Sequence, residues 1–163
     1  MSVSDSVVID ADPMSIYARI GDPRQTCAWS PENTGARLDE PAGELRAGAT
    51  FIGSNRRGRT TWVTRCTVTD AEPGEVFAFT VGQIGPRTPR LRVPIATWEY
   101  RLRPVAAGTE VTETWTDLRT RWPDAAARAF DFVATRGKTF AQFNAGNIAI
   151  TLRNLKRTIE SGR

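Results

Sequence analysis

The sequence predicts an α+β domain in which a seven-stranded, curved antiparallel sheet wraps around a long C-terminal helix. Three observations lead to this prediction. Apolar and polar residues alternate from Ala36 to Asp117, the pattern becomes helical after Pro123, and two Asp-Pro pairs separate the first predicted strand from the others. A sheet with one apolar face must cover that face, and only the C-terminal helix is long enough to do so.

The chain has the size and composition of a single domain. It contains 163 residues, of which 40% are hydrophobic, and neither a linker nor an internal repeat divides it. We therefore expect one domain over residues 1–163. No apolar run reaches the roughly 20 residues that cross a bilayer, and the N-terminus lacks a signal-peptide pattern. These features predict a cytoplasmic protein without a transmembrane segment.

Two short helices are predicted from their start and stop signals. After a first strand at Val3–Ile9, the pair Asp12-Pro13 combines an N-cap residue with a proline in the first helical position. Gly21 ends this helix, and Asp22-Pro23 repeats the start signal at once. The two short helices therefore lie between the first strand and the rest of the sheet.

Six further strands are predicted from the alternation and from the turn signals between them, and they should form an antiparallel meander. The segment Gly82–Pro94 carries three prolines and two glycines, and we interpret it as a loop that gates a cavity, connects two strands plainly or docks a partner. The expected strands cover residues 36–39, 49–55, 60–70, 75–82, 95–103 and 109–117.

Strand parity gives the predicted sheet one apolar face and one polar face. Aromatic side chains dominate the apolar face, where most of them are expected to be ordinary core and the rest to line a cavity. Cys66 is a small wall residue there and not a nucleophile. The residues assigned to this wall are Trp29, which closes one end, and Phe51, Trp62, Cys66, Phe77, Phe79, Trp98, Trp115 and Phe140.

Glu113 is the one carboxylate that parity places on the apolar face. Its neighbours on that face are Val111 and Trp115, and burial there would favour the neutral acid. Glu113 is thus a candidate general acid or base, with Tyr100 on the next strand as a hydroxyl partner. The alternative, which we favour over catalysis, is that Glu113 lies in water at a cavity mouth or that a bulge reverses its parity.

The C-terminal helix carries polar residues among its apolar ones. After the last strand the pattern predicts a short helix, a break near Gly137 and a longer helix over residues 140–160. Asn144, Asn147 and Thr151 lie on its inward side. A buried amide needs a partner, so these residues contact either a ligand or other polar groups of the core. Ligand contact is weighted most strongly for Asn144.

The residue composition excludes several functions. The chain has no histidine and two cysteines, which removes His-based zinc sites, Ser-His pairs and Cys-His pairs. We expect no metal and no cofactor. The net charge of +4 is modest, and the Arg-rich segments 55–59 and 87–92 are interpreted as solvated loops, so nucleic acid is not an expected partner. Asn55 either faces the cavity or, by slight preference, occupies a turn.

Five segments together resemble the START-related, polyketide cyclase-like (SRPBCC) superfamily, of the polyketide cyclase/dehydrase and lipid transport type. The resemblance implies the helix-grip fold, in which a curved sheet holds a long helix and often encloses a cavity for lipids, sterols or polyketides. Some members are cyclases, aromatases or hydrolases, and others are carriers or sensors. The segments are DADPMSIYARIGDP (10–23), WSPE (29–32), GATFIGSN (48–55), TWEYRLRPVAAGTEVTETWTD (97–117) and GNIAITLRNLKRTIE (146–160).

Three functions follow from these patterns. The first is binding of a small hydrophobic or aromatic molecule, lipid-like or polyketide-like, whose polar end is held by Asn144, Asn147 and Glu113. The second is a cyclase or dehydratase that uses Glu113 or Tyr100 for proton transfer. The third is a protein-interaction scaffold. We prefer them in that order, and a protein partner or a homodimer is compatible with each.

Overall fold

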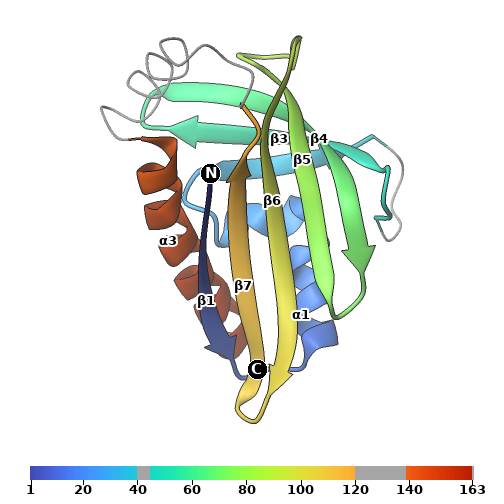
Figure 1. The fold of residues 1–163 in the computed structure, drawn as a ribbon, viewed down its shortest axis with the longest axis vertical. Helices are drawn as coiled ribbons and strands as arrows, with labels where there is room; N and C mark the ends of the chain where they lie inside the picture. Colours follow the sequence, from blue (N-terminus) through green and yellow to red (C-terminus); the bar gives the residue numbers. More distant parts are fainter. Residues whose placement is uncertain (40–44, 120–138, 163) are drawn as a thin grey trace.

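The computed structural model describes residues 1–39, 45–119 and 139–162, and it confirms the predicted α+β architecture (Figure 1). Within these residues, seven strands form one antiparallel sheet in the order β1-β7-β6-β5-β4-β3-β2. The sheet is the predicted meander, closed at one edge by the first strand. The strands are β1 (Ser2–Ile9), β2 (Asn33–Leu38), β3 (Thr50–Arg57), β4 (Thr60–Glu72), β5 (Val76–Gly85), β6 (Leu91–Val105) and β7 (Gly108–Asp117).

Two short helices follow β1, as the Asp-Pro pairs predict. They are the α-helix α1 (Pro13–Ile20) and the 3-10 helix η1 (Pro23–Ala28). The Asp12 carboxylate accepts a hydrogen bond of 2.9 Å from the main-chain nitrogen of Ser15. Asp22 accepts one of 3.1 Å from the main-chain nitrogen of Arg24. Each aspartate therefore accepts a hydrogen bond from a main-chain N–H group of the first helical turn that has no partner within the helix.

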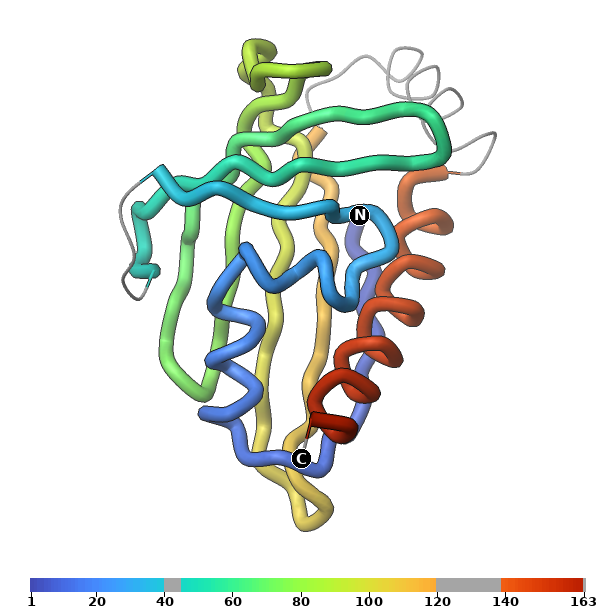
Figure 2. The backbone as a smooth tube through the Cα atoms, turned by 180° about the vertical axis from the view of Figure 1, so that it is seen from behind, coloured from blue at the N-terminus to red at the C-terminus, as the bar shows by residue number. Residues whose placement is uncertain are grey.

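The long helix α3 spans Phe140–Ser161. It begins with a capping box, because the Thr139 hydroxyl accepts from the main chain of Gln142 and the Gln142 side chain accepts from the main chain of Thr139, both at 3.2 Å. Figures 1 and 2 place α1, η1 and α3 on the same side of the sheet, with α3 along β1. The predicted short helix after Pro123 and the break near Gly137 lie outside the described residues.

Two long-range hydrogen bonds fix the C-terminal half of α3 to the end of β1. The Lys156 ammonium donates to the carbonyl oxygen of Val8 at 2.6 Å. The Glu160 carboxylate accepts from the main-chain nitrogen of Asp10 at 3.0 Å, and Lys156 and Glu160 also pair with each other at 3.0 Å. These contacts join the beginning of the described chain to its last helix.

The segment Gly82–Pro94 is mostly strand, so its prediction as one long loop is wrong. β5 and β6 extend into it from both sides, and Gln83 pairs with Arg92. A register shift after Val81 absorbs the irregularity around Gly82 and Pro94, and the ladder then continues to the pair Ile84 and Leu91. What remains between the two strands is a short connection, residues 86–90.

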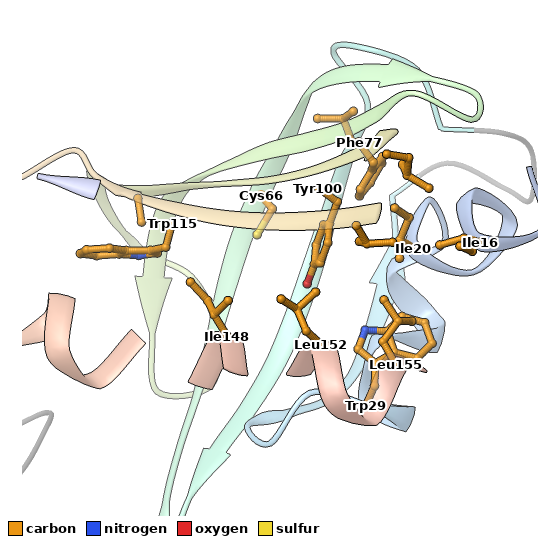
Figure 3. Close-up of a cluster of buried hydrophobic side chains, with 14 of the residues drawn as sticks. Ile16, Ile20, Trp29, Cys66, Phe77, Tyr100, Trp115, Ile148, Leu152 and Leu155 are labelled. Atoms are coloured by element: carbon orange, nitrogen blue, oxygen red, sulfur yellow. The ribbon is translucent and has the colours of Figure 1, made fainter. Parts of the chain in front are cut away.

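The apolar core lies between the sheet and the helices (Figure 3). α3 contributes Ile148, Leu152 and Leu155, and the sheet contributes Phe77 and Trp115, each at most 2% exposed. A continuous cluster of buried apolar residues links α1, α3 and Trp29, which follows η1, to the strands, so the sheet face that parity predicts to be apolar is the covered one. In the described ranges, no helix is long and apolar enough to cross a membrane.

Candidate functional site

A cavity of about 460 Å³ lies between the sheet and α3. Its walls come from β3 to β7, from α3 and from the chain around η1. Pockets for drug-sized molecules measure roughly 300 to 1,000 Å³. The cavity is therefore large enough to hold a small organic ligand.

Glu113 and Tyr100 form a hydrogen-bonded pair on the cavity wall. They are direct partners in the ladder between β6 and β7, and the Tyr100 hydroxyl donates to Oε1 of Glu113 at 2.7 Å. Burial raises the pKa of the Glu113 carboxyl to about 8, and the hydrogen bond from Tyr100 opposes this only in part. Burial, followed by the neighbouring carboxyl, also raises the pKa of Tyr100. Both groups are therefore mainly protonated at neutral pH.

Two buried polar atoms on the wall lack a hydrogen-bond partner among the described residues. They are Oε2 of Glu113 and Nδ2 of Asn144, on side chains of residues that are 2% and 4% exposed. Each such atom costs roughly 1 to 3 kcal/mol of folding free energy. These are the two points of the wall where a bound molecule would gain most from a polar contact.

A second polar group, the Arg57 cluster of Glu32, Arg57, Phe143 and Asn147, lies beside the cavity. The Arg57 guanidinium forms a bidentate ion pair with Glu32, in which the Nη2 to Oε2 distance is 3.0 Å. Its central carbon lies 3.7 Å from the Phe143 ring centroid, and Asn147 donates to Glu32 at 3.1 Å. The cluster therefore ties α3 to β3 and to the chain that enters β2.

The fold around this cavity recurs in known proteins. A profile described as polyketide cyclase / dehydrase and lipid transport matches residues 1–160. The chain belongs to this family. No curated protein matches the sequence.

Solved structures share the fold of this family member over nearly its whole length. A START superfamily protein from Mycobacterium smegmatis is 12% identical, with 99% of each chain covered and a TM-score of 0.70. A polyketide cyclase-like protein from Corynebacterium glutamicum is 27% identical over 99% of this chain and 92% of its own, with a TM-score of 0.57. A Nitrosomonas europaea protein is 12% identical over 99% and 96%, with a TM-score of 0.69. The START-related resemblance of the sequence is confirmed.

The structure places all but one of the predicted site residues on the cavity wall. The exception is Trp29. Whether the wall residues contact a ligand or move protons remains a prediction. Those on the wall are Phe51, Trp62, Cys66, Phe77, Phe79, Trp98, Tyr100, Glu113, Trp115, Phe140, Asn144, Asn147 and Thr151.

Trp29 lies in the core and not on the wall, which corrects its predicted position. It is 2% exposed and is drawn beside Leu155 in Figure 3. Its carbonyl oxygen accepts a hydrogen bond of 3.0 Å from the Asn154 side chain of α3. This bond joins the end of η1 to the C-terminal half of α3, so the indole fills the space between these two helices.

Sequence reasoning missed Arg57, which it assigned to a solvated loop. β3 continues through Arg57, and the hairpin turn falls on Gly58 with φ +59°, so the preferred turn assignment for Asn55 is also wrong. Asn55 and Arg57 both line the cavity. The alternative in which Asn55 faces the cavity was the correct one, and strand parity counted onward from it would have found Arg57, because alternate residues of a strand share a face.

Cys66 behaves as a wall residue. Burial raises the pKa of its thiol to about 12, so it carries no thiolate nucleophile at neutral pH. In the part of the chain that the structure describes, no three side chains of His, Cys, Asp or Glu form a group that could hold a metal ion.

Arg57→Lys is expected to lower the free energy of unfolding by about 1 to 2 kcal/mol. Lysine keeps the charge, but it loses the planar fork that fits the Glu32 carboxylate and stacks on Phe143. Urea unfolding followed by tryptophan fluorescence measures the change.

Arg56→Lys is the matched control for this substitution, because Arg56 is the adjacent exposed arginine. It is expected to change the unfolding free energy by less than about 0.5 kcal/mol. Equal losses in the two variants would show that the Arg57 cluster does not hold α3 to the strands.

Proposed function

We propose that the protein binds a small hydrophobic or aromatic molecule in the cavity between the sheet and α3. The observation that carries this proposal is the combination of an aromatic-walled space of about 460 Å³ with two buried, unpartnered polar atoms on Glu113 and Asn144. Apolar walls with a few convergent polar groups are typical of sites for such ligands. Family membership supports the same function.

The energetics of the wall favour a ligand over a plain structural core. A core without a binding role is normally close-packed and leaves few polar atoms unpaired. Here the wall of the open space includes Glu113 and Asn144, whose Oε2 and Nδ2 atoms have no hydrogen-bond partner among the described residues. A ligand that fills the space and pairs these atoms recovers both the lost packing and the lost hydrogen bonds.

Native mass spectrometry of the purified protein tests the proposal. We expect a retained small molecule, or, after delipidation, saturable uptake of the apolar fluorophore N-phenyl-1-naphthylamine. Asn144→Leu is expected to weaken retention of the natural ligand, because leucine cannot donate a hydrogen bond.

Ala145→Leu is the control for this experiment, since it places the same side chain at the neighbouring exposed position of α3. It should leave retention unchanged. A wild-type protein that carries no molecule and takes up no fluorophore would rule out the binding function.

A cyclase or dehydratase activity is the second candidate, and the Tyr100–Glu113 pair favours it. A carboxyl with a pKa of about 8 can give and take protons near neutral pH, as general acid-base catalysis requires. Within the same cavity, aromatic walls would fold a polyketide chain for ring closure. Turnover of a polyketide substrate by Glu113→Gln at the wild-type rate would remove this role from Glu113.

A further inference from the structure

We propose that the ligand presents a carbonyl oxygen to Glu113 and Asn144, which receive it together as two hydrogen-bond donors on an otherwise apolar wall. This inference rests on the proposed binding function and names the chemical class of its ligand. It is carried by the position of the two side chains, by their unpartnered atoms and by the partner that Glu113 already has.

The contact between β7 and α3 brings the two side chains to the same level of the cavity. The Trp115 ring of β7 stacks on the Phe140 ring of α3, with centroids 6.2 Å apart. Glu113 lies two residues before Trp115, about 7 Å along the strand, and Asn144 lies about 6 Å beyond Phe140 along the helix. β7 ends near the point where α3 begins (Figures 1 and 2). Glu113 and Asn144 therefore lie in the same direction from the stacked rings of Trp115 and Phe140.

Both unpartnered atoms act as donors. Nδ2 of Asn144 is an amide nitrogen and can only donate. Oε1 of Glu113 accepts the Tyr100 hydroxyl, so we place the proton of the neutral carboxyl on Oε2, the oxygen that has no partner among the described residues. Burial keeps this carboxyl neutral at pH 7 by raising its pKa to about 8.

A carbonyl oxygen matches two donors better than other common polar groups do. Its two lone pairs accept both bonds, and it brings no proton of its own that would need a further acceptor. A ligand hydroxyl would leave its own proton to be paired, and a ligand ammonium would meet two donors. A carboxylate would have to give up its water, and the arginines around this cavity, Arg57 in its wall and Arg119 over the Phe140 ring, already pair with Glu32 and Asp117.

A matched pair of probes tests the inference: 9-fluorenone and fluorene, which share a skeleton and differ in the carbonyl. Their dissociation constants are measured by displacement of N-phenyl-1-naphthylamine. The quantity compared is the ratio of the two constants in each protein, which cancels the difference in hydrophobicity. We expect Asn144→Leu and Glu113→Leu each to lower the preference for fluorenone by about tenfold, the change that 1.4 kcal/mol gives.

Glu113→Gln separates hydrogen bonding from charge. Glutamine keeps an oxygen for Tyr100 and offers an N–H in place of the acid O–H, so it should retain most of the fluorenone preference that Glu113→Leu loses. Glu110→Leu is the matched control, because Glu110 lies on the same strand and pairs with Arg103 on the polar face. It should leave the ratio unchanged. The infrared C=O band of bound fluorenone should also lie lower in the wild type than in Asn144→Leu.

The outcomes distinguish the two levels of the proposal. If both probes bind and their ratio is the same in the wild type, Asn144→Leu and Glu113→Leu, the carbonyl assignment is overturned while the binding function stands. If neither probe nor the fluorophore binds, the binding function fails and the carbonyl inference fails with it.

Discussion

The free energy of unfolding of the wild-type protein is expected to fall as the pH rises from 5 to 8, and Glu113→Gln is expected to remove this fall. The folded state holds the Glu113 proton up to a pKa of about 8, whereas the unfolded chain releases it above the ordinary value of 4.5. Between these values folding requires uptake of a proton. The contribution of Glu113 to stability is therefore complete below pH 4.5 and is lost progressively as the pH rises toward 8.

The expected fall in the free energy of unfolding is large for a single side chain. Each unit of pKa difference is worth about 1.4 kcal/mol, so the full window is worth on the order of 5 kcal/mol. Urea unfolding at a series of pH values measures it.

The same window contains few competing titrations. The chain has no histidine, the side chain that ordinarily titrates there. The Asp12, Asp22, Asp39 and Asp117 carboxyls have lowered pKa values, so they affect stability on the acid side. Glu113 faces the Tyr100 hydroxyl from β6, and its partner in the β1 ladder, Asp5, is exposed.

Glu110→Gln serves as the control for the pH experiment, because it removes a carboxyl from the same strand but from the polar face. It should keep the wild-type slope. If Glu113→Gln also keeps that slope, then Glu113 is not the neutral, buried acid described here.

Trp115→Ala is expected to lower the free energy of unfolding by about 3 to 5 kcal/mol, the usual cost of removing a buried aromatic ring. Trp115 is 2% exposed, and its stacking on Phe140 at 6.2 Å joins β7 to the first turn of α3. Its loss would enlarge the cavity and remove the stacked indole from the Phe140 ring. Differential scanning calorimetry and urea unfolding both measure the effect.

Trp62→Ala removes the same atoms from another part of the cavity wall. Trp62 is only half-buried, and one of its contacts is with the Arg57 guanidinium, 5.4 Å from its ring. The cost should be roughly 1 to 2 kcal/mol, since less apolar surface is returned to water. Equal costs for the two tryptophans would contradict the assignment of Trp115 to the contact between sheet and helix.

The fold could be predicted from the sequence because its signals are local. The aspartates at 12 and 22 mark helix starts through contacts within three residues, and alternation over single strands fixes which face is apolar. Parity also placed Glu113 inward beside Tyr100. The alternative favoured from the sequence, a water-exposed or bulge-reversed Glu113, is wrong, because the residue is 2% exposed and pairs with Tyr100 in a ladder without a register shift. Local signals of this kind can be recognised without knowing how the connecting segments place the elements relative to one another.

The rest of the site depends on contacts between distant segments. The partner of Arg57 is Glu32, 25 residues away, and no local pattern pairs the two. The carbonyl oxygen of Trp29 accepts a hydrogen bond from the side chain of Asn154, which lies 125 residues later in the chain. The register shift after Val81 is likewise a property of two strands together, and it decides where the β5–β6 ladder resumes beyond Gly82.

The attachment of α3 to β1 has a consequence for the order of synthesis. β1 is made well before its partners in the sheet and over the core, residues 108–117 and 140–161. On the ribosome, β1 therefore has no place to dock until those residues emerge, and the many contacts of high sequence separation predict slow folding. A nascent chain that lacks residues 140–161 thus has no closed cavity for a ligand, and we expect loading only after α3 has emerged.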